Sequence, residues 1–118
     1  MYTGKHFTTI DSANFLIAVD AMQNAVQAGT AVRAYIPDIV VCGKTGSVQN
    51  DPLPEHSVFI AFAPRENPKI AVSVYVEFSG MGGRSAASIA GLLIEKYLKG
   101  KVTRQYVEDY VKHGEFLN

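Results

Sequence analysis

The segment Ser57-Val58-Phe59-Ile60-Ala61-Phe62-Ala63 decides the fold, because it is apolar at nearly every position. Its alternating side chains form two apolar sets: Val58, Ile60 and Phe62 on one face, and Phe59, Ala61 and Ala63 on the other. A strand that is apolar on both faces is typical of the centre of a sheet that is covered above and below. Residues 57–63 are therefore predicted to form a central strand.

Turn signals separate this segment from two further strands. Residues 64–68 contain two prolines and lead into residues 70–77, where large apolar residues alternate with smaller or mixed ones. A short turn of this kind joins antiparallel strands. Upstream, the proline-containing residues 49–56 predict a loop. Before that loop, the β-branched run at residues 39–42 leads into Gly43-Lys44-Thr45-Gly46-Ser47, which we interpret as a third strand.

A helix is expected before the strands. Asp11 is predicted to cap it, with Ile10 and Phe15 at the two positions of a hydrophobic staple. Its apolar face carries Phe15, Val19, Met22 and Val26 at helical spacing. Gly29 is expected to end it with a C′ glycine cap, which is usually left-handed.

Two helices are expected after the strands. Residues 84–98 predict a helix that ends before Gly100, and its small residues suit close packing on a sheet. Thr103 is expected to cap a last short helix, in which Tyr106 and Tyr110 are interpreted as packing residues rather than a binding platform. The order of elements predicts an α+β domain, with a three-stranded antiparallel sheet and flanking helices.

Composition limits the possible functions. The chain has 118 residues, enough for one domain, and 47% of them are hydrophobic, which excludes disorder. Eleven basic residues balance eleven acidic ones, which disfavours a nucleic-acid partner. Only 19% of the residues are charged, against a usual value of about 25%, which hints that part of the surface contacts something other than water. No apolar run approaches the roughly 18–20 residues of a membrane span.

The Gly43-Lys44-Thr45 sequence has two possible interpretations. A phosphate-binding loop needs a glycine where this chain has Asp38, and a helix directly after the threonine, so that interpretation is disfavoured. The alternative is the Lys-Thr-Gly strand of serine acyl-transferases that handle penicillin. There the lysine and the hydroxyl attract a carboxylate, and the glycine lets a peptide-like substrate approach the backbone.

The longer run Gly43-Lys44-Thr45-Gly46-Ser47-Val48-Gln49 resembles the G-K-T-G-[TS]-x-Q segment of class B penicillin-binding proteins. Further segments are similar to the same family: Gly29-Thr30-Ala31 with Arg33 and Pro37, residues 56–64, residues 67–72, and Gly82-Gly83 before a helix rich in small residues. The resemblance runs from about Thr9 to Leu98 and is closest to the elongation-type penicillin-binding protein 2. It implies a fragment of the penicillin-binding-protein/β-lactamase-like transpeptidase fold.

The resemblance also shows what this chain lacks. No serine is followed three residues later by lysine, so the Ser-x-x-Lys nucleophile motif is absent. Ser12-Ala13-Asn14 matches Ser-x-Asn, but its place in a first helical turn suggests local backbone bonding instead. We therefore expect residues 1–118 to be the C-terminal part of a transpeptidase domain cut from a longer protein, without two of the family's five strands or the nucleophile helix. Met1 is then an added start or an internal methionine.

The resemblance implies roles for four residues. Lys44 would exchange protons with the Ser-x-Asn serine of the intact domain, and Thr45 would bind the carboxylate of the substrate or of a β-lactam. Gly46 would allow close approach, and the Ser47 N–H would form half of an oxyanion hole. Lys44 is thus the single catalytic candidate in the chain, and the isolated chain is expected to be inactive.

The remaining chemistry-bearing residues predict no other site. Cys42 lies in an apolar strand and is interpreted as a small core residue. The three histidines, His6, His56 and His113, have no ligand spacing, so no metal is expected, and no cofactor is implied.

Two functions remain open. The first is a piece of a peptidoglycan D,D-transpeptidase that binds stem peptides and β-lactams, and the second is a stand-alone carboxylate- or peptide-binding module without catalysis. The resemblance implies a parent anchored in the bacterial inner membrane, with this domain on the periplasmic side and cell-elongation membrane proteins as partners. The fragment itself is expected to be soluble and to self-associate, because a missing helix and a missing strand leave apolar surface and a strand edge open.

Overall fold

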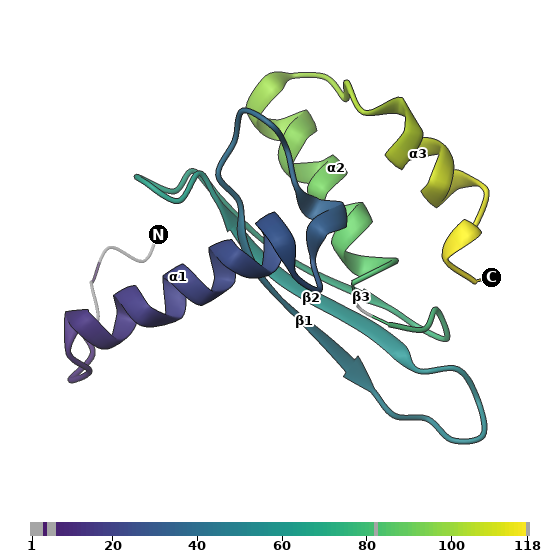
Figure 1. The fold of residues 1–118 in the computed structure, drawn as a ribbon, viewed down its shortest axis with the longest axis horizontal. Coiled ribbons are helices and arrows are strands. Elements are labelled where there is room, and N and C mark those ends of the chain that lie inside the picture. The colour runs from purple at the N-terminus through teal and green to yellow at the C-terminus, as the bar shows by residue number, and fades with distance from the viewer. Residues whose placement is uncertain (1–3, 5–6, 82, 118) are drawn as a thin grey trace.

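Three antiparallel strands in the order β1-β2-β3 form the sheet: β1 (Cys42–Val48), β2 (His56–Ala63) and β3 (Ile70–Val76). The computed structural model describes residues 4, 7–81 and 83–117. The remaining elements are α1 (Ser12–Ala28), the short 3-10 helix η1 (Val32–Ala34), α2 (Ala86–Lys99), α3 (Gln105–Lys112) and η2 (Glu115–Leu117). The predicted α+β order and the central position of the segment at 57–63 are confirmed (Figure 1).

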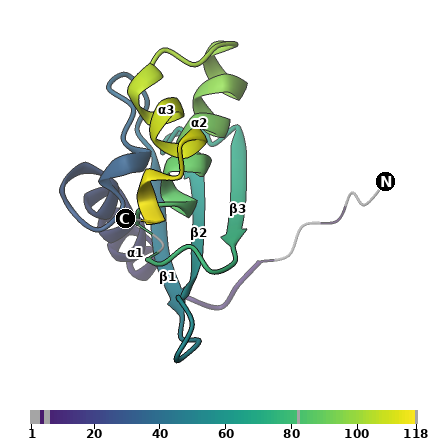
Figure 2. The ribbon, with the colours of Figure 1, turned by 90° about the vertical axis from the view of Figure 1, so that its right-hand side faces the viewer.

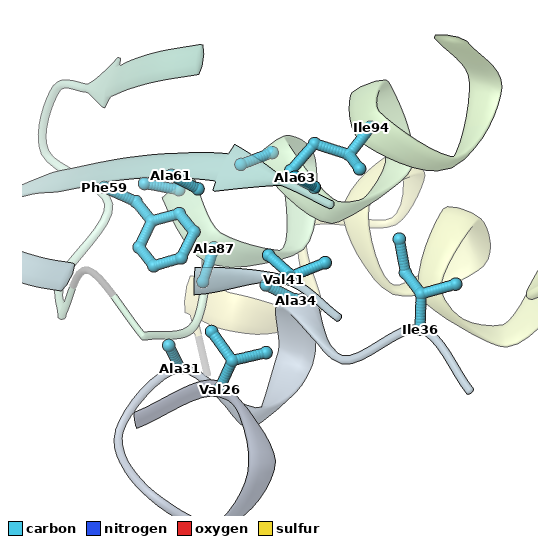
Figure 3. Packing of buried hydrophobic residues seen from close by; sticks show 12 residues of the cluster. Val26, Ala31, Ala34, Ile36, Val41, Phe59, Ala61, Ala63, Ala87 and Ile94 are labelled. Atoms are coloured by element: carbon cyan, nitrogen blue, oxygen red, sulfur yellow. The ribbon is translucent and has the colours of Figure 1, made fainter. Parts of the chain in front are cut away.

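One face of the sheet carries the core. The buried set of β2 is Ser57, Phe59, Ala61 and Ala63, and α2 packs over it with Ala86, Ala87, Ala90 and Ile94, all fully buried (Figure 3). The small side chains of α2 let the helix approach the sheet closely, as predicted. Gly43 serves the same packing, because a Cβ at this position would lie 2.2 Å from Cζ of Phe59.

The opposite face of the sheet is open among the described residues. Ile60 and Tyr75 point to this face and are 48% and 54% exposed. The expectation that the helix at 84–98 covers one face of the middle strand is confirmed. On the second face, the side chains of β2 are apolar, as in a strand that is covered on both faces, but no described helix packs over them.

Helix α1 is docked through its C-terminal half. Val26 is buried beside β1, and the guanidinium of Arg65 pairs with Asp20 at 2.6 Å and with the Gln23 amide oxygen. The N-terminal half projects beyond the sheet, where Phe15 is 45% exposed (Figure 1). In Figure 2, α1 lies beside β1, at the opposite edge of the sheet from β3.

Two predicted helix caps need correction, and the cap predicted at Asp11 is confirmed. The Asp11 carboxylate accepts from the Ala13 N–H, and Gly100 ends α2 with φ +76°. Gly29 ends α1 with φ −114° and not in the left-handed region, because the chain folds back so that the Ala31 N–H also reaches the Ala25 carbonyl. Thr103 does not cap α3, because its hydroxyl instead donates to Glu95.

No helix within the described ranges combines the length and the apolarity needed to cross a membrane.

Candidate functional site

Strand β1 brings two hydroxyl side chains to a groove of about 710 Å³. Thr45 and Ser47 are two residues apart on the strand, so their side chains lie on the same face of the sheet. The groove is lined by Thr30, Val32, Arg33, Thr45, Ser47, Met81, Gly83, Arg84, Tyr106 and Val107. These residues come from β1, from the segment around η1, from the β3–α2 connection and from α3.

The position of Thr45 is set by contacts with the segment before η1. Its hydroxyl oxygen lies 3.1 Å from that of Thr30, so the two share a hydrogen bond. The Thr30 carbonyl in turn lies against Gly83, where a Cβ would come within 2.0 Å of the carbonyl oxygen. Only glycine at position 83 lets the β3–α2 connection approach the Thr30 loop this closely.

Lys44 points away from this groove. The alternation of side chains along β1 places it on the open face of the sheet, opposite Ile60. Its side chain is exposed, and Nζ donates to the Thr45 carbonyl at 2.6 Å. The four predicted site residues therefore share one strand, but Lys44 lies on one face and Thr45 and Ser47 on the other.

Gly46 is not required by packing within this chain. A Cβ at position 46 would meet Val58 Cβ at 3.7 Å, which is ordinary van der Waals contact, whereas Gly43 has no such room. Position 43 and position 46 are therefore glycine for different structural reasons. Gly43 makes room for the Phe59 ring, and Gly46 leaves open space on the face that carries Lys44.

The groove is basic. Arg33 and Arg84 line it, and no Asp or Glu is among its lining residues. The Arg33 guanidinium lies 3.9 Å from the centroid of the Tyr110 ring, which holds this cation in place at the groove wall. Two cations and two hydroxyls suit an anionic group such as a carboxylate.

Several groove residues were missed or misread from the sequence. Tyr106 was predicted to pack, but it is 71% exposed and lines the groove. Tyr110 does pack, against Arg33 and Phe116. Arg84 carried no signal in the sequence, whereas Thr30 and Arg33 lie in a segment that was noted only for its family resemblance.

The remaining candidates behave as structural residues. Cys42 is fully buried, and burial raises the pKa of its thiol, which suppresses thiolate reactivity. The His56 Nδ1 accepts from the Phe78 N–H, and no group of three potential metal ligands gathers within the described part of the chain. Ser12 and Asn14 are exposed in the first turn of α1, at the end that projects from the sheet (Figure 1).

The strand geometry also bears on the phosphate-loop interpretation. Gly43, Lys44 and Thr45 lie within β1, and the chain continues through a proline-containing loop into β2. No helix N-terminus follows the threonine, so the arrangement lacks the anion-binding element of that motif.

Comparison with known proteins identifies relatives of this chain. A family model described as the penicillin binding protein transpeptidase domain matches residues 3–95. "Peptidoglycan D,D-transpeptidase PbpA" of Mycobacterium tuberculosis is 41% identical over an alignment of 78 residues that covers 58% of this chain and 16% of that protein. "Peptidoglycan D,D-transpeptidase MrdA" of Haemophilus influenzae is 32% identical over 107 residues, covering 75% of this chain and 16% of that protein.

Solved structures show the same similarity. The PBP2 of Pseudomonas aeruginosa in complex with WCK 5153 superposes with a TM-score of 0.68 at 32% identity, over 85% of this chain and 23% of that one. Penicillin-binding protein A of M. tuberculosis, as a ceftriaxone acyl-enzyme complex, gives a TM-score of 0.62 at 32% identity, over 69% and 20%. This chain spans about one sixth of the length of the curated relatives it matches.

Proposed function

Because this chain belongs to the family of penicillin-binding-protein transpeptidase domains, we propose that it is the C-terminal part of a serine D,D-transpeptidase domain. The whole protein would cross-link peptidoglycan stem peptides through a serine acyl-enzyme and would be acylated by β-lactams. This chain would supply the Lys-Thr-Gly wall of the site. The proposal rests on one observation: the groove is basic, and the hydroxyl-bearing residues Thr45 and Ser47 line it.

The proposed roles divide between the two faces of β1. The Thr45 hydroxyl binds the substrate carboxylate, aided by the positive charges of Arg33 and Arg84. The Ser47 N–H contributes one donor of an oxyanion hole, and the nucleophile's own N–H supplies the other. On the opposite face, Lys44 exchanges protons with the serine of a Ser-x-Asn motif that another part of the intact domain provides.

The open face of the sheet supports this division. Lys44 and Ile60 lie there without cover, and the open space at Gly46 is on the same face. A helix carrying Ser-x-x-Lys would cover the apolar side chains of this face and bring its serine toward β1. The site is thus completed by a segment that packs on the face carrying Lys44.

The same proposal extends to location and partners. The whole protein would be anchored in the bacterial inner membrane with this domain on the periplasmic side, among cell-elongation membrane proteins. Isolated, this chain would pair with a second copy through its open face. A stand-alone carboxylate-binding module is the second candidate function, because the groove is formed by this chain's residues alone.

A fluorescent penicillin tests the proposal. We expect no covalent band when the 118-residue chain is incubated with the probe and separated by denaturing electrophoresis, because a chain without the nucleophile cannot form an acyl-enzyme. The longer gene product, with Ser-x-x-Lys, is expected to label stoichiometrically. A stoichiometric band on the short chain would contradict the assignment of the nucleophile to another segment. A gene with no upstream transpeptidase sequence would favour the binding module.

A further inference from the structure

A buried ion pair links the two C-terminal helices. Arg104 is 6% exposed and Glu95 is fully buried, and Nε of Arg104 lies 3.4 Å from a carboxylate oxygen of Glu95. The Thr103 hydroxyl donates to the other carboxylate oxygen at 2.7 Å. Burial alone would raise the pKa of Glu95, but the Thr103 hydroxyl and the Arg104 guanidinium outweigh it and hold the pKa below its ordinary value. The pair is therefore ionised at neutral pH.

The same guanidinium binds the backbone around η1. Nη1 of Arg104 donates to the Tyr35 carbonyl at 2.7 Å and lies 3.4 Å from the Arg33 carbonyl. Gly91 of α2 provides the space, because a Cβ there would lie 3.2 Å from Nη2 of Arg104 and 3.0 Å from Cα of Ala34. One side chain from the start of α3 thus joins α2 to the segment that contains η1.

This segment is the one that positions Thr45. Ala31 and Ala34 are fully buried, and the Ala34 N–H donates to the Ala31 carbonyl at 3.0 Å, so η1 is continuous with the Thr30 loop. The Thr30 hydroxyl then bonds that of Thr45. A continuous series of contacts therefore runs from Arg104 to the backbone carbonyls of Arg33 and Tyr35, along the η1 backbone to Thr30, and from the Thr30 hydroxyl to Thr45.

We propose that Arg104 is a positioning residue for Thr45, holding the Thr30 hydroxyl against the Thr45 hydroxyl through the η1 backbone. The functional part of this inference rests on the proposed role of Thr45 in carboxylate binding. Arg104 lies beyond residue 95, where the match to the family model ends. Its charge is balanced by Glu95, which lets a guanidinium with several donors reach backbone carbonyls inside the protein.

Threonine-methyl NMR of the 118-residue chain tests the positioning. In Arg104→Met, and in the double variant Glu95→Gln with Arg104→Met, we expect the methyl signals of Thr30 and Thr45 to shift or broaden. The double variant leaves no unpaired buried charge, and so remains informative if the single variant fails to fold. Arg104→Lys is expected to restore these signals only in part, because an ammonium lacks the planar fork of donors.

Lys99→Met is the matched control. Lys99 also joins α2 to the same connecting segment, through Asp38 at 2.9 Å, but it does not touch the η1 carbonyls. We expect it to leave the Thr30 and Thr45 signals in place. Unchanged Thr30 and Thr45 signals in both Arg104 variants, or equal changes in Lys99→Met, would overturn the positioning role.

Acylation of the longer gene product separates this inference from the proposed function. The Arg104 double variant is expected to react with penicillin about three- to tenfold more slowly than the wild type, and Lys99→Met at the wild-type rate. If Thr45→Val slows acylation and the Arg104 variant does not, the inference fails while the proposed function stands. If the wild-type protein is never acylated, the proposed function fails, and the NMR comparison still decides whether Arg104 positions Thr45.

Discussion

Thr45 has one hydroxyl, which faces the groove and also lies 3.1 Å from the Thr30 hydroxyl. Replacing Thr45 by the near-isosteric valine removes this hydroxyl while keeping the β-branched shape that suits a strand. If the hydroxyl binds a charged carboxylate, its loss costs about 1.5–3 kcal/mol.

We therefore expect Thr45→Val in the intact domain to slow acylation by penicillin by about tenfold to a hundredfold. Stopped-flow or gel-based acylation rates measure the effect. Thr9→Val, the same chemical change at an exposed position, is the control and should react at the wild-type rate. An unchanged rate in Thr45→Val would show that the carboxylate binds elsewhere.

Gly43 and Gly46 offer a matched pair of substitutions on one strand. Gly43→Ala places a methyl group 2.2 Å from the buried Phe59 ring, and overpacking of this kind costs roughly 1–3 kcal/mol. Gly46→Ala meets nothing closer than 3.7 Å and is expected to leave the free energy of unfolding unchanged within about 0.5 kcal/mol.

Urea unfolding of the two variants measures this difference directly. Equal losses of stability would mean that the Phe59 ring does not occupy the space beside Gly43. In the intact domain, Gly46→Ala should instead slow acylation, because the added methyl group stands on the face where the segment that carries the nucleophile is proposed to pack.

At the scale of elements, α2 and α3 are joined by the Glu95–Arg104 pair. The pKa of Glu95 is lowered in the folded protein, so its carboxylate contributes stability above the pKa of the unfolded chain. This contribution is lost as the pH falls through the folded pKa. Removing one partner of a buried pair costs about 3–5 kcal/mol, because the other charge is left unpaired.

Glu95→Gln is therefore expected to destabilise the chain by about 3–5 kcal/mol near neutral pH, with the difference from wild type becoming smaller as the pH falls from neutral into the acid range below the unfolded pKa of the carboxyl group. Urea unfolding across this pH range measures the effect. Glu108→Gln is the control, since the Glu108–Lys112 pair lies at the surface of α3 and contributes about 0.5 kcal/mol at most. A pH-independent difference for Glu95→Gln would contradict an ionised pair.

At the scale of the whole molecule, one apolar face and one strand edge are open. Ile60 and Tyr75 lie on the open face, and β3 is the last strand of the sheet beside them. Such an edge pairs readily with another strand. Burying about 600 Å² of apolar surface would contribute on the order of 15 kcal/mol before the costs of association.

We expect the isolated chain to form a dimer or an exchanged assembly, detected by light scattering on a size-exclusion column. Ile60→Lys should shift the equilibrium toward monomer. Leu93→Lys is the control, because Leu93 on α2 is as exposed as Ile60 but lies off the open face. A monomer of the wild-type chain at high concentration would refute the proposed association.

Local patterns in the sequence were sufficient to predict the three α-helices, the three strands and the family, but not the short 3-10 helices η1 and η2. The apolar side chains on both faces of residues 57–63 and the alternation in residues 70–77 identified β2 and β3, and the small residues of α2 indicated its close packing on the sheet. These patterns are local because side chains return to the same face every two residues in a strand and every 3.6 residues in a helix. The run at residues 43–49 carried the family resemblance for the same reason, since its functional groups are consecutive in the chain.

Only the tertiary structure decided the composition of the groove. Thr30, Arg84 and Tyr106 line the same groove as Thr45 although they come from segments far apart in the chain, and no periodicity links their positions. The Thr103 cap was misjudged because its hydroxyl bonded Glu95 of the preceding helix in place of the α3 backbone. The role of Arg104 depends in the same way on carbonyls about 70 residues earlier, which packing alone brings within hydrogen-bonding distance.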